Sequence, residues 1–295
     1  MINFMKYKVV YFIISILIIL PGLYFLFTDG IKFGIDFTGG ALLEYRFEKS
    51  VPLDVLKGEI TNQGVEVGQI TEIGSNTYVI RTKPLDQNKI SKLKEGLDKK
   101  FGKIEVRREE FVGPVVGSEL RQKAIYAVFL SSLFIVLYIT FSFRKVPKPA
   151  SSLRFGICAV VALVHDVLLV LGVFAILGKF LEVEIDTLFV TAMLTIIGFS
   201  VHDTIVVFDR IRENLIKNMD KKFTDVANLS IVQTLARSLN TSLTVVFVLT
   251  ALLLFGGETI RWFVVALLVG IVSGTYSSIF NATALLVWWE ERLGH

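Results

Sequence analysis

The chain has 295 residues, 53% of them hydrophobic, and a mean hydropathy of +0.63, which excludes a soluble domain of this size. Its formal net charge of +4 comes without a basic stripe interleaved with aromatic residues, so nucleic acid is not an expected partner. The single cysteine, Cys158, excludes a disulfide framework.

Six stretches of about 20 apolar residues predict transmembrane helices. They are residues 9–27, 124–143, 155–177, 188–208, 239–255 and 262–289. The first follows Lys6 and Lys8, as a signal peptide would, but it is too long for that and lacks a small-residue cleavage site. We therefore expect an uncleaved first helix and a multi-pass membrane protein.

The Lys and Arg residues of the loops predict the orientation of these helices. Residues 144–154 carry four of them and residues 209–238 carry six. The loops expected on the opposite side carry one each, at Lys179 and Arg261. Both termini are therefore expected in the cytoplasm.

Residues 28–123 form the longest polar segment and divide the chain into three parts: 1–27, 28–123 and 124–295. Helical patterns cover 52–64, starting with Pro, and 86–102, with Asp86 as a plausible cap. Strand patterns cover 41–47, 65–73, 76–82 and 103–112, and "GSN" (74–76) predicts a hairpin turn. The order β-α-β-β-α-β predicts an α+β ferredoxin-like domain on the extracytoplasmic side, between helices 1 and 2.

The motif "GIDFTGG" (34–40) joins the first helix to this domain. Gly34, Gly39 and Gly40 allow positive φ and close backbone approach. A structural turn in which Asp36 caps local amides is the favoured interpretation. A phosphate-binding loop is excluded, because such a loop needs a Lys and a following helix, whereas a strand follows here.

Three of the predicted helices carry residues that lipid does not tolerate. Val-His-Asp occurs twice, at His165–Asp166 and at His202–Asp203, and Arg237 precedes the fifth apolar stretch. A carboxylate at the bilayer centre costs about 2.5–3.5 kcal/mol on insertion scales. Helical rise places the two carboxyls about 8 Å apart in depth, so a close dyad is not the simplest arrangement. Asp203 is the acid that we expect within reach of Arg237.

Polar residues form two helical stripes that we expect to face each other or a hydrated cavity. The stripes are Ser200, Asp203, Arg210 and Asn214, and Ser230, Gln233, Arg237, Asn240, Thr241 and Thr244. In the last helix, "GIVSG" places Gly270 and Gly274 four residues apart, which favours close helix packing.

These residues admit more than one role. Burial favours the neutral form of a carboxyl and a nearby cation favours the charged form, so Asp203 beside a movable Arg237 can take up and release protons. A static Asp203–Arg237 ion pair that fixes helix packing is the alternative. Structural hydrogen bonding and proton relay are both open for Asp166, and the two histidines are interpreted as local partners. No metal-ligand spacing or nucleophile–base pair occurs, so neither a metal, a cofactor nor enzymatic activity is expected.

Four motifs together resemble those of the SecD/SecF family of protein-export membrane proteins, and specifically its SecF members. They are "GIDFTGG", "VGPVVGSELR" (112–121), "HDV" (165–167) and "DTIVVFDRIREN" (203–214). The resemblance covers essentially the whole chain. One half of the resistance-nodulation-division exporters is also similar to this arrangement of six helices with a domain after the first.

The resemblance implies a subunit that uses the proton motive force to promote passage of secretory proteins through the SecYEG channel. It implies location in the lipid of the bacterial cytoplasmic (inner) membrane and a separate SecD chain as partner. The family's proton-conducting Asp and Arg map onto Asp203 and Arg237, while His202 stands where many relatives have Asn. Two alternatives remain: a non-conducting scaffold of the translocon, and a half-size proton-driven small-molecule exporter, against which the single compact soluble domain argues.

Overall fold

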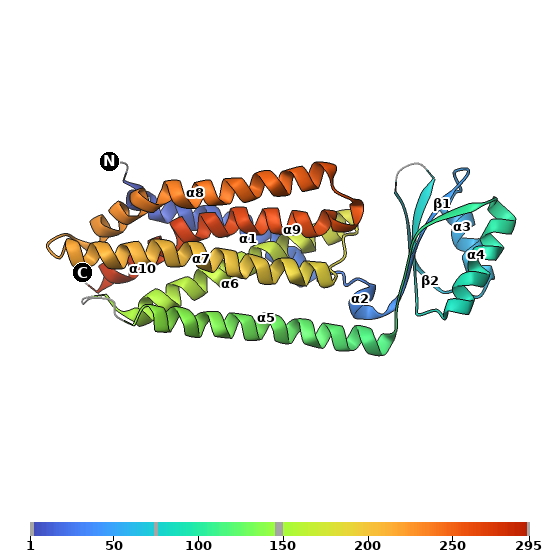
Figure 1. The fold of residues 1–295 in the computed structure, drawn as a ribbon, viewed down its shortest axis with the longest axis horizontal. Coiled ribbons are helices and arrows are strands. Elements are labelled where there is room, and N and C mark those ends of the chain that lie inside the picture. The colour runs from blue at the N-terminus through green and yellow to red at the C-terminus, as the bar shows by residue number, and fades with distance from the viewer. Residues whose placement is uncertain (1–2, 74–75, 145–149, 294–295) are drawn as a thin grey trace. The chain divides into compact units, whose positions relative to one another are not determined.

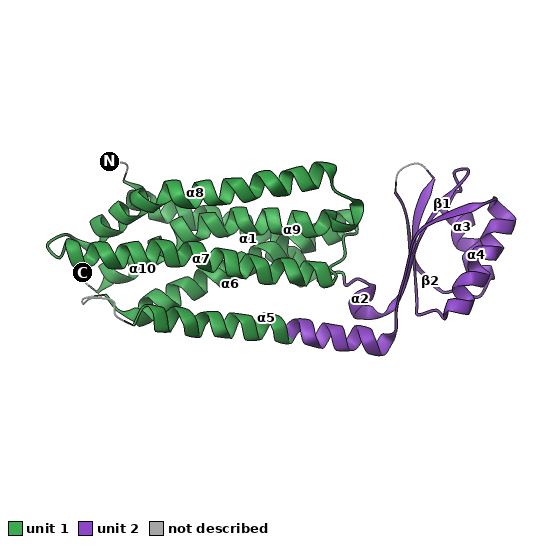
Figure 2. Ribbon diagram, in the orientation of Figure 1, with its two compact units in different colours: residues 1–32, 126–295 green, residues 33–125 purple. Residues whose placement is uncertain are grey.

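The computed structural model describes residues 3–73, 76–144 and 150–293, which fold as two compact units. Unit 1 comprises residues 1–32 and 126–295, and unit 2 comprises residues 33–125 (Figure 2). Unit 1 is helical, whereas unit 2 is built around a four-stranded sheet.

Six helical segments of the described residues are long and apolar enough to cross a membrane. They are Phe4–Thr28, containing α1 (Lys8–Thr28), then α5 (Pro114–Ser142), α6 (Ser152–Leu181), α7 (Thr187–Lys217), α8 (Phe223–Phe255) and Glu258–Arg292 (Figure 1). Each overlaps one predicted apolar stretch. The multi-pass membrane architecture predicted from hydropathy is thus confirmed.

Two of these segments differ from their predicted form. The helix α8 begins well before residue 239, because its first turns are amphipathic and bury Val226, Ala227 and Ile231. The last segment consists of α9 (Glu258–Tyr276), a π-helical turn η2 (Ser277–Ala282) and α10 (Thr283–Arg292). Because a π-turn is wider than an α-turn, it alters which side chains point into the bundle.

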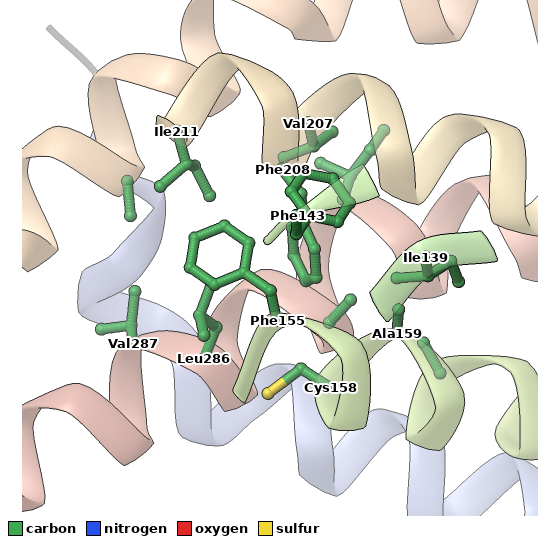
Figure 3. Packing of buried hydrophobic residues seen from close by; sticks show 14 of the residues in the cluster. Ile139, Phe143, Phe155, Cys158, Ala159, Val207, Phe208, Ile211, Leu286 and Val287 are labelled. Carbon is green, nitrogen blue, oxygen red and sulfur yellow. The ribbon is translucent and has the colours of Figure 1, made fainter. Parts of the chain in front are cut away.

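Three buried aromatic side chains pack together in the core of unit 1. Phe143 follows α5, Phe155 begins α6, and Phe208 lies on α7 (Figure 3). The Phe155 and Phe208 ring centroids are 5.1 Å apart, and Phe143 lies 5.5 Å from Phe155. All three side chains are buried, so they join these three helices through apolar contact.

Polar contacts bring the first and last described residues of unit 1 to the same end (Figure 1). The Phe4 backbone N–H donates to Asn228 Oδ1 on α8 at 2.8 Å. Lys8 at the start of α1 pairs with Glu291 on α10. Arg154 of α6 pairs with the fully buried Glu290 of α10.

Unit 2 contains β1 (Gly40–Phe47), α3 (Leu53–Asn62), β2 (Val67–Glu72), β3 (Thr77–Thr82), α4 (Gln87–Phe101) and β4 (Ile104–Val112). The strand order is β2-β3-β1-β4, and every neighbouring pair is antiparallel. This order of elements agrees with the β-α-β-β-α-β order predicted from the sequence. Buried residues of α3 and α4, including Leu56, Ile90 and Leu97, pack with Leu43 and Ile80 of the sheet.

Two local predictions for unit 2 concern the cap before α4 and the hairpin turn between β2 and β3. Asp86 occupies the cap position before α4, although within the described residues its side chain accepts no hydrogen bond from the first turn. Of the expected hairpin turn at residues 74–76, residues 74–75 lie outside the described residues. The described residues beside it fit a hairpin, because Ile73 N donates to Thr77 O at 2.7 Å and Asn76 has a φ of 61°.

The motif at residues 34–40 contains a one-turn helix, α2 (Ile35–Thr38), with Asp36 in its first turn. Gly39 and Gly40 have φ values of 72° and 142°, which L side chains rarely adopt. A Cβ on Gly39 would lie 3.0 Å from the Pro114 Cα, so this backbone approaches the start of α5 closely. Gly34 has an ordinary φ of −70°, so it does not use the positive φ that glycine allows.

Candidate functional site

Asp166 on α6 is a fully buried carboxylate inside the helical unit, and protein groups supply its hydrogen bonds. Its Oδ2 accepts hydrogen bonds from Ser200 Oγ and Ser277 Oγ, each at 2.6 Å. Its Oδ1 accepts from Ser273 Oγ at 2.9 Å and lies 3.0 Å from His165 Nδ1. Hydroxyl groups here replace the water that a carboxylate would otherwise need.

Small residues of α9 make this approach of helices possible. A Cβ on Gly274 would lie 3.0 Å from Ser200 Cβ and 3.5 Å from Asp166 Oδ2. A Cβ on Gly270 would overlap the side chain of Ile196, one turn away on α7. The "GIVSG" motif therefore gives α9 close contact with α7 at the level of the carboxylate.

The second carboxylate, Asp203 on α7, is less well hydrogen-bonded than Asp166. It keeps only 2% of its surface exposed, and in the described part of the chain its Oδ2 has no hydrogen-bond partner. The Ser242 and Thr275 hydroxyls, 2.6 Å from each other, lie beside it. His202 Nδ1 is 3.7 Å from Asp203 Oδ1, and its side chain is 68% exposed.

The two carboxyls lie closer in depth than helical counting suggested. Asp166 binds Ser200, which precedes Asp203 by three residues, about 4.5 Å of helical rise. The same level holds further polar contacts: Thr204 Oγ1 donates to Ser278 Oγ at 2.8 Å, and Ser278 Oγ donates to the Ser200 carbonyl at 2.9 Å. A continuous polar layer thus crosses α6, α7 and η2.

Arg237 does not reach Asp203 in this structure. Its side chain is exposed, and among the described residues it forms no ion pair with any carboxylate. The neighbouring Ser238 is buried instead. Because successive helical residues are turned by about 100°, the face of α8 that enters the bundle carries Ser238 and excludes Arg237.

The two predicted polar stripes contact each other over only part of their length. Arg210 Nε donates to Gln233 Oε1 at 2.7 Å, and Asn214 Nδ2 donates to Ser230 Oγ at 2.9 Å and to Gln233 Oε1 at 2.8 Å. Beyond Arg237 the expected stripe is exposed: Asn240, Thr241 and Thr244. The buried stripe of α8 is Ser230, Thr234, Ser238 and Ser242.

The sequence interpretation missed most of the hydroxyl groups that are buried in the helical unit. These are Thr204, Thr234, Ser238, Ser242, Ser273, Thr275 and Ser277. A repeated spacing of four residues on α8, and the same spacing between Ser273 and Ser277, was the available signal. Such an arrangement can hold a proton on either carboxyl and pass it between hydroxyls, since each hydroxyl both donates and accepts.

Two models of known families match the chain, over residues 24–51 and over residues 92–292. The model described as "Protein export membrane protein SecD/SecF, C-terminal" matches residues 92–292. The model described as "SecD/SecF GG Motif" matches residues 24–51, which include Gly39 and Gly40.

Individual relatives are similar over nearly the whole chain. A protein named protein translocase subunit SecF from Thermobaculum terrenum is 48% identical over 99% of this chain and 95% of its own length. A protein of the same name from Anaerolinea thermophila is 42% identical, with the same two coverages.

A solved structure shares the fold. The crystal structure of SecDF from Thermus thermophilus, described as a translocon-associated membrane protein, superimposes with a TM-score of 0.86 at 35% identity. The match covers 99% of this chain but only 39% of the SecDF chain.

Proposed function

Because the chain belongs to the SecD/SecF family of protein-export membrane proteins, we propose that it is a SecF-type subunit that promotes Sec-dependent protein translocation. The function that we assign to it is proton-coupled movement of a protein chain, without enzymatic activity. The similar proteins named as translocase subunits support this role.

The proposed partners are SecD, the SecYEG channel, the translocating secretory protein and the surrounding lipid. SecD is the first of these partners because the solved structure that shares the fold is a SecDF chain, of which this chain matches 39%. The exposed apolar side chains of α1, α5 and α8 provide surface for both lipid and SecD.

We place the protein in the bacterial cytoplasmic membrane with both termini in the cytoplasm. Arg210, Arg212 and Lys217 lie near the α7–α8 connection, at the end of unit 1 where the N- and C-terminal segments also meet (Figure 1). The positive-inside rule favours the cytoplasm for that end. Unit 2 is then a ferredoxin-like domain on the extracytoplasmic side, available to the emerging passenger.

The observation that carries the proton-coupling proposal is the burial of two carboxyls at neighbouring depths with unequal partners. Asp166 has four donors, whereas Asp203 has an oxygen without a partner in the described chain and no Lys or Arg beside it. An ionised carboxylate is costly in such surroundings. Proton uptake and release therefore favour different arrangements of the helices around the two groups, with His202 as a neighbouring base.

Arg237 lies on the exposed face of α8, and we include it in the proton-coupling proposal. An unpaired guanidinium within a membrane span is unfavourable, so we assign its counter-charge to a carboxylate of SecD or, in another conformation, to Asp203. Asn240, Thr241 and Thr244 continue the same exposed face and supply further polar contacts for the partner.

The available energy is adequate for a conformational switch. One proton crossing 100 mV supplies about 2.3 kcal/mol, which shifts a two-state population roughly fifty-fold. A few protons per cycle are enough to bias the position of unit 2 and hence the direction of the passenger.

A scaffold without proton coupling is the second candidate, favoured by the number of helices that Asp166 joins. Its bonds to Ser200, Ser273 and Ser277 link α6, α7, α9 and η2, as a purely structural polar cluster would.

Export in vesicles that contain SecD separates the two candidates. With an imposed proton gradient, Asp203→Asn should assemble normally but lose the gradient-dependent part of export. Collapsing the gradient in the parent should give the same loss. If the parent exports equally well without the gradient, or Asp203→Asn fails only through lost assembly, the scaffold interpretation replaces proton coupling.

A further inference from the structure

A cavity of about 400 Å³ lies between α1, α6 and the η2–α10 segment. Its walls are almost entirely apolar. Three polar residues line it: Ser15 on α1, His165 on α6 and Asn281 on η2. All three belong to one connected hydrogen-bond chain, so the few polar groups at the cavity lie together.

The imidazole of His165 connects this cavity to Asp166. Its Nδ1 lies 3.0 Å from Asp166 Oδ1, and its Nε2 lies 3.2 Å from Asn281 Nδ2. The His165 side chain is 13% exposed, whereas that of Asp166 is 0% exposed. Of these two titratable groups, only His165 is accessible from the cavity.

The Asn281 amide defines the proton positions on this ring. Its Nδ2 donates to Ser15 Oγ at 2.6 Å and to His165 Nε2, so Nε2 accepts and the ring proton is on Nδ1, directed at Asp166. In the described residues, Asn281 Oδ1 is buried and has no partner. Rotating the amide by half a turn would place this acceptor beside Nε2 and Ser15.

We propose that His165 transfers protons between the cavity and Asp166, with Asn281 as the positioning residue that accommodates both tautomers. A proton arriving from the cavity side binds Nε2, and the Nδ1 proton moves to Asp166 Oδ1. The ring is then neutral with its proton on Nε2, which donates to the rotated Asn281 Oδ1. The reverse sequence returns one proton to the cavity.

Few other titratable groups surround the ring. On α6 these are Asp166 itself and Cys158, which lines the same cavity. Along α1 and α9, Tyr11 and Tyr276 are joined to each other by a 2.9 Å bond from Tyr276 Oη to the Tyr11 carbonyl, and no described contact joins either to the ring. The only carboxyl in contact with the ring, among described residues, is Asp166, which makes it the acceptor for the transferred proton.

This inference rests on the proposed proton coupling and is tested in proteoliposomes that contain the full chain and SecD. A pH-sensitive dye inside reports proton entry under an imposed gradient. His165→Gln retains amide hydrogen bonding but has no titrating nitrogen. We expect proton entry to fall by about a hundredfold, the lower end of the effect of a positioned proton-transfer group. Thermal stability and co-purification with SecD should be unchanged, and Val164→Ala, at an exposed position of α6 that does not line the cavity, should transport like the parent.

Chemical rescue distinguishes proton transfer from a structural role. His165→Ala leaves space for an added small ring, and imidazole should restore proton entry while pyrrole, which lacks a basic nitrogen, should not. Equal rescue by both rings would overturn the proposal. Parental transport by His165→Gln, together with loss in Asp166→Asn, would overturn the relay and leave the proposed function intact. Absence of gradient-driven proton entry in the parent would overturn both.

Discussion

Ser277 Oγ donates a 2.6 Å hydrogen bond to Asp166 Oδ2 and so joins the π-helical turn η2 directly to the buried carboxylate of α6. Hydrogen bonds to a charged acceptor are stronger than those to a neutral one. Protonation of Asp166 therefore weakens the attachment of η2, where the last helical segment is already irregular. This bond is a physical route from proton binding to helix movement.

Removing this hydroxyl should uncouple the turn from the carboxylate. For Ser277→Ala we expect a loss of about 1.5–3 kcal/mol in unfolding free energy, the usual range for a hydrogen bond to a charged group, and weaker gradient-dependent export. Thermal unfolding in detergent and vesicle export measure the two effects. Ser131→Ala on α5 is the control, because Ser131 bonds only to the Val128 carbonyl among described contacts. Equal effects of the two substitutions would contradict a special role for Ser277.

Close packing of α9 against α7 depends on Gly270. Gly270→Ala places a Cβ against Ile196, which should cost about 1–3 kcal/mol through overpacking. Gly198→Ala on α7 meets no atom within 4 Å in the described structure and should be nearly neutral. Trimming the partner in Gly270→Ala/Ile196→Ala should recover part of the loss, as measured by a double-mutant cycle of unfolding free energies. Additive losses would show that the contact is absent.

The ion pair between Arg154 and Glu290 should stabilise the end of unit 1 where the termini meet. Glu290 is completely buried, so Glu290→Gln removes the carboxylate charge that faces the largely buried Arg154 guanidinium and should cost about 3 kcal/mol or more. The exposed pair Glu258–Arg261 provides the comparison, and Glu258→Gln should cost less than about 1 kcal/mol. Chemical denaturation of both variants in the same detergent measures the difference. Similar costs would mean that Glu290 is already neutral or solvated.

Unit 2 should lose stability at alkaline pH through Tyr45. Burial, and then its 2.7 Å hydrogen bond to Glu109, raise the pKa of the Tyr45 phenol above its usual value. The folded form keeps the phenol proton that the unfolded chain releases above about pH 10, so unfolding becomes easier as the pH rises beyond that value.

Pulse proteolysis of the full chain in urea, with cleavage within residues 33–125 as the readout, measures this effect at pH 8 and near pH 11. In Tyr45→Phe the pH dependence should be smaller than in the parent, while Tyr24→Phe, which alters an exposed ring of α1, should keep the parental dependence. An unchanged slope in Tyr45→Phe would refute the assignment.

Most of the fold could be predicted from the sequence because its signals are local. Uninterrupted apolar stretches located the six membrane helices, and alternating residues bounded by Pro52, Gly64 and Gly102 indicated the strands and helices of unit 2. Gly39 and Gly40 were singled out because their conformations are nearly exclusive to glycine.

The site was predicted only in part because helix rotation is not a local property. Asp166, Asp203 and the contacts of Asn214 were identifiable from polarity within apolar surroundings. The inward face of α8 was not, since Arg237 and Ser238 are adjacent and a rotation of about 100° decides which one enters the bundle. Serine and threonine are tolerated on either face of a membrane helix, so their clustering around Asp166 gave little signal before the helices were assembled.

The central claim is that the buried carboxyls change protonation when a proton gradient acts on the protein. Infrared difference spectroscopy of SecD-containing proteoliposomes, before and after a gradient is imposed, observes the carbonyl band of protonated carboxyl groups directly. We predict a gradient-induced change in this band that is reduced in Asp166→Asn and in Asp203→Asn and persists in Val164→Ala. A parental spectrum without such a change, or one that both Asn variants leave intact, would contradict the account.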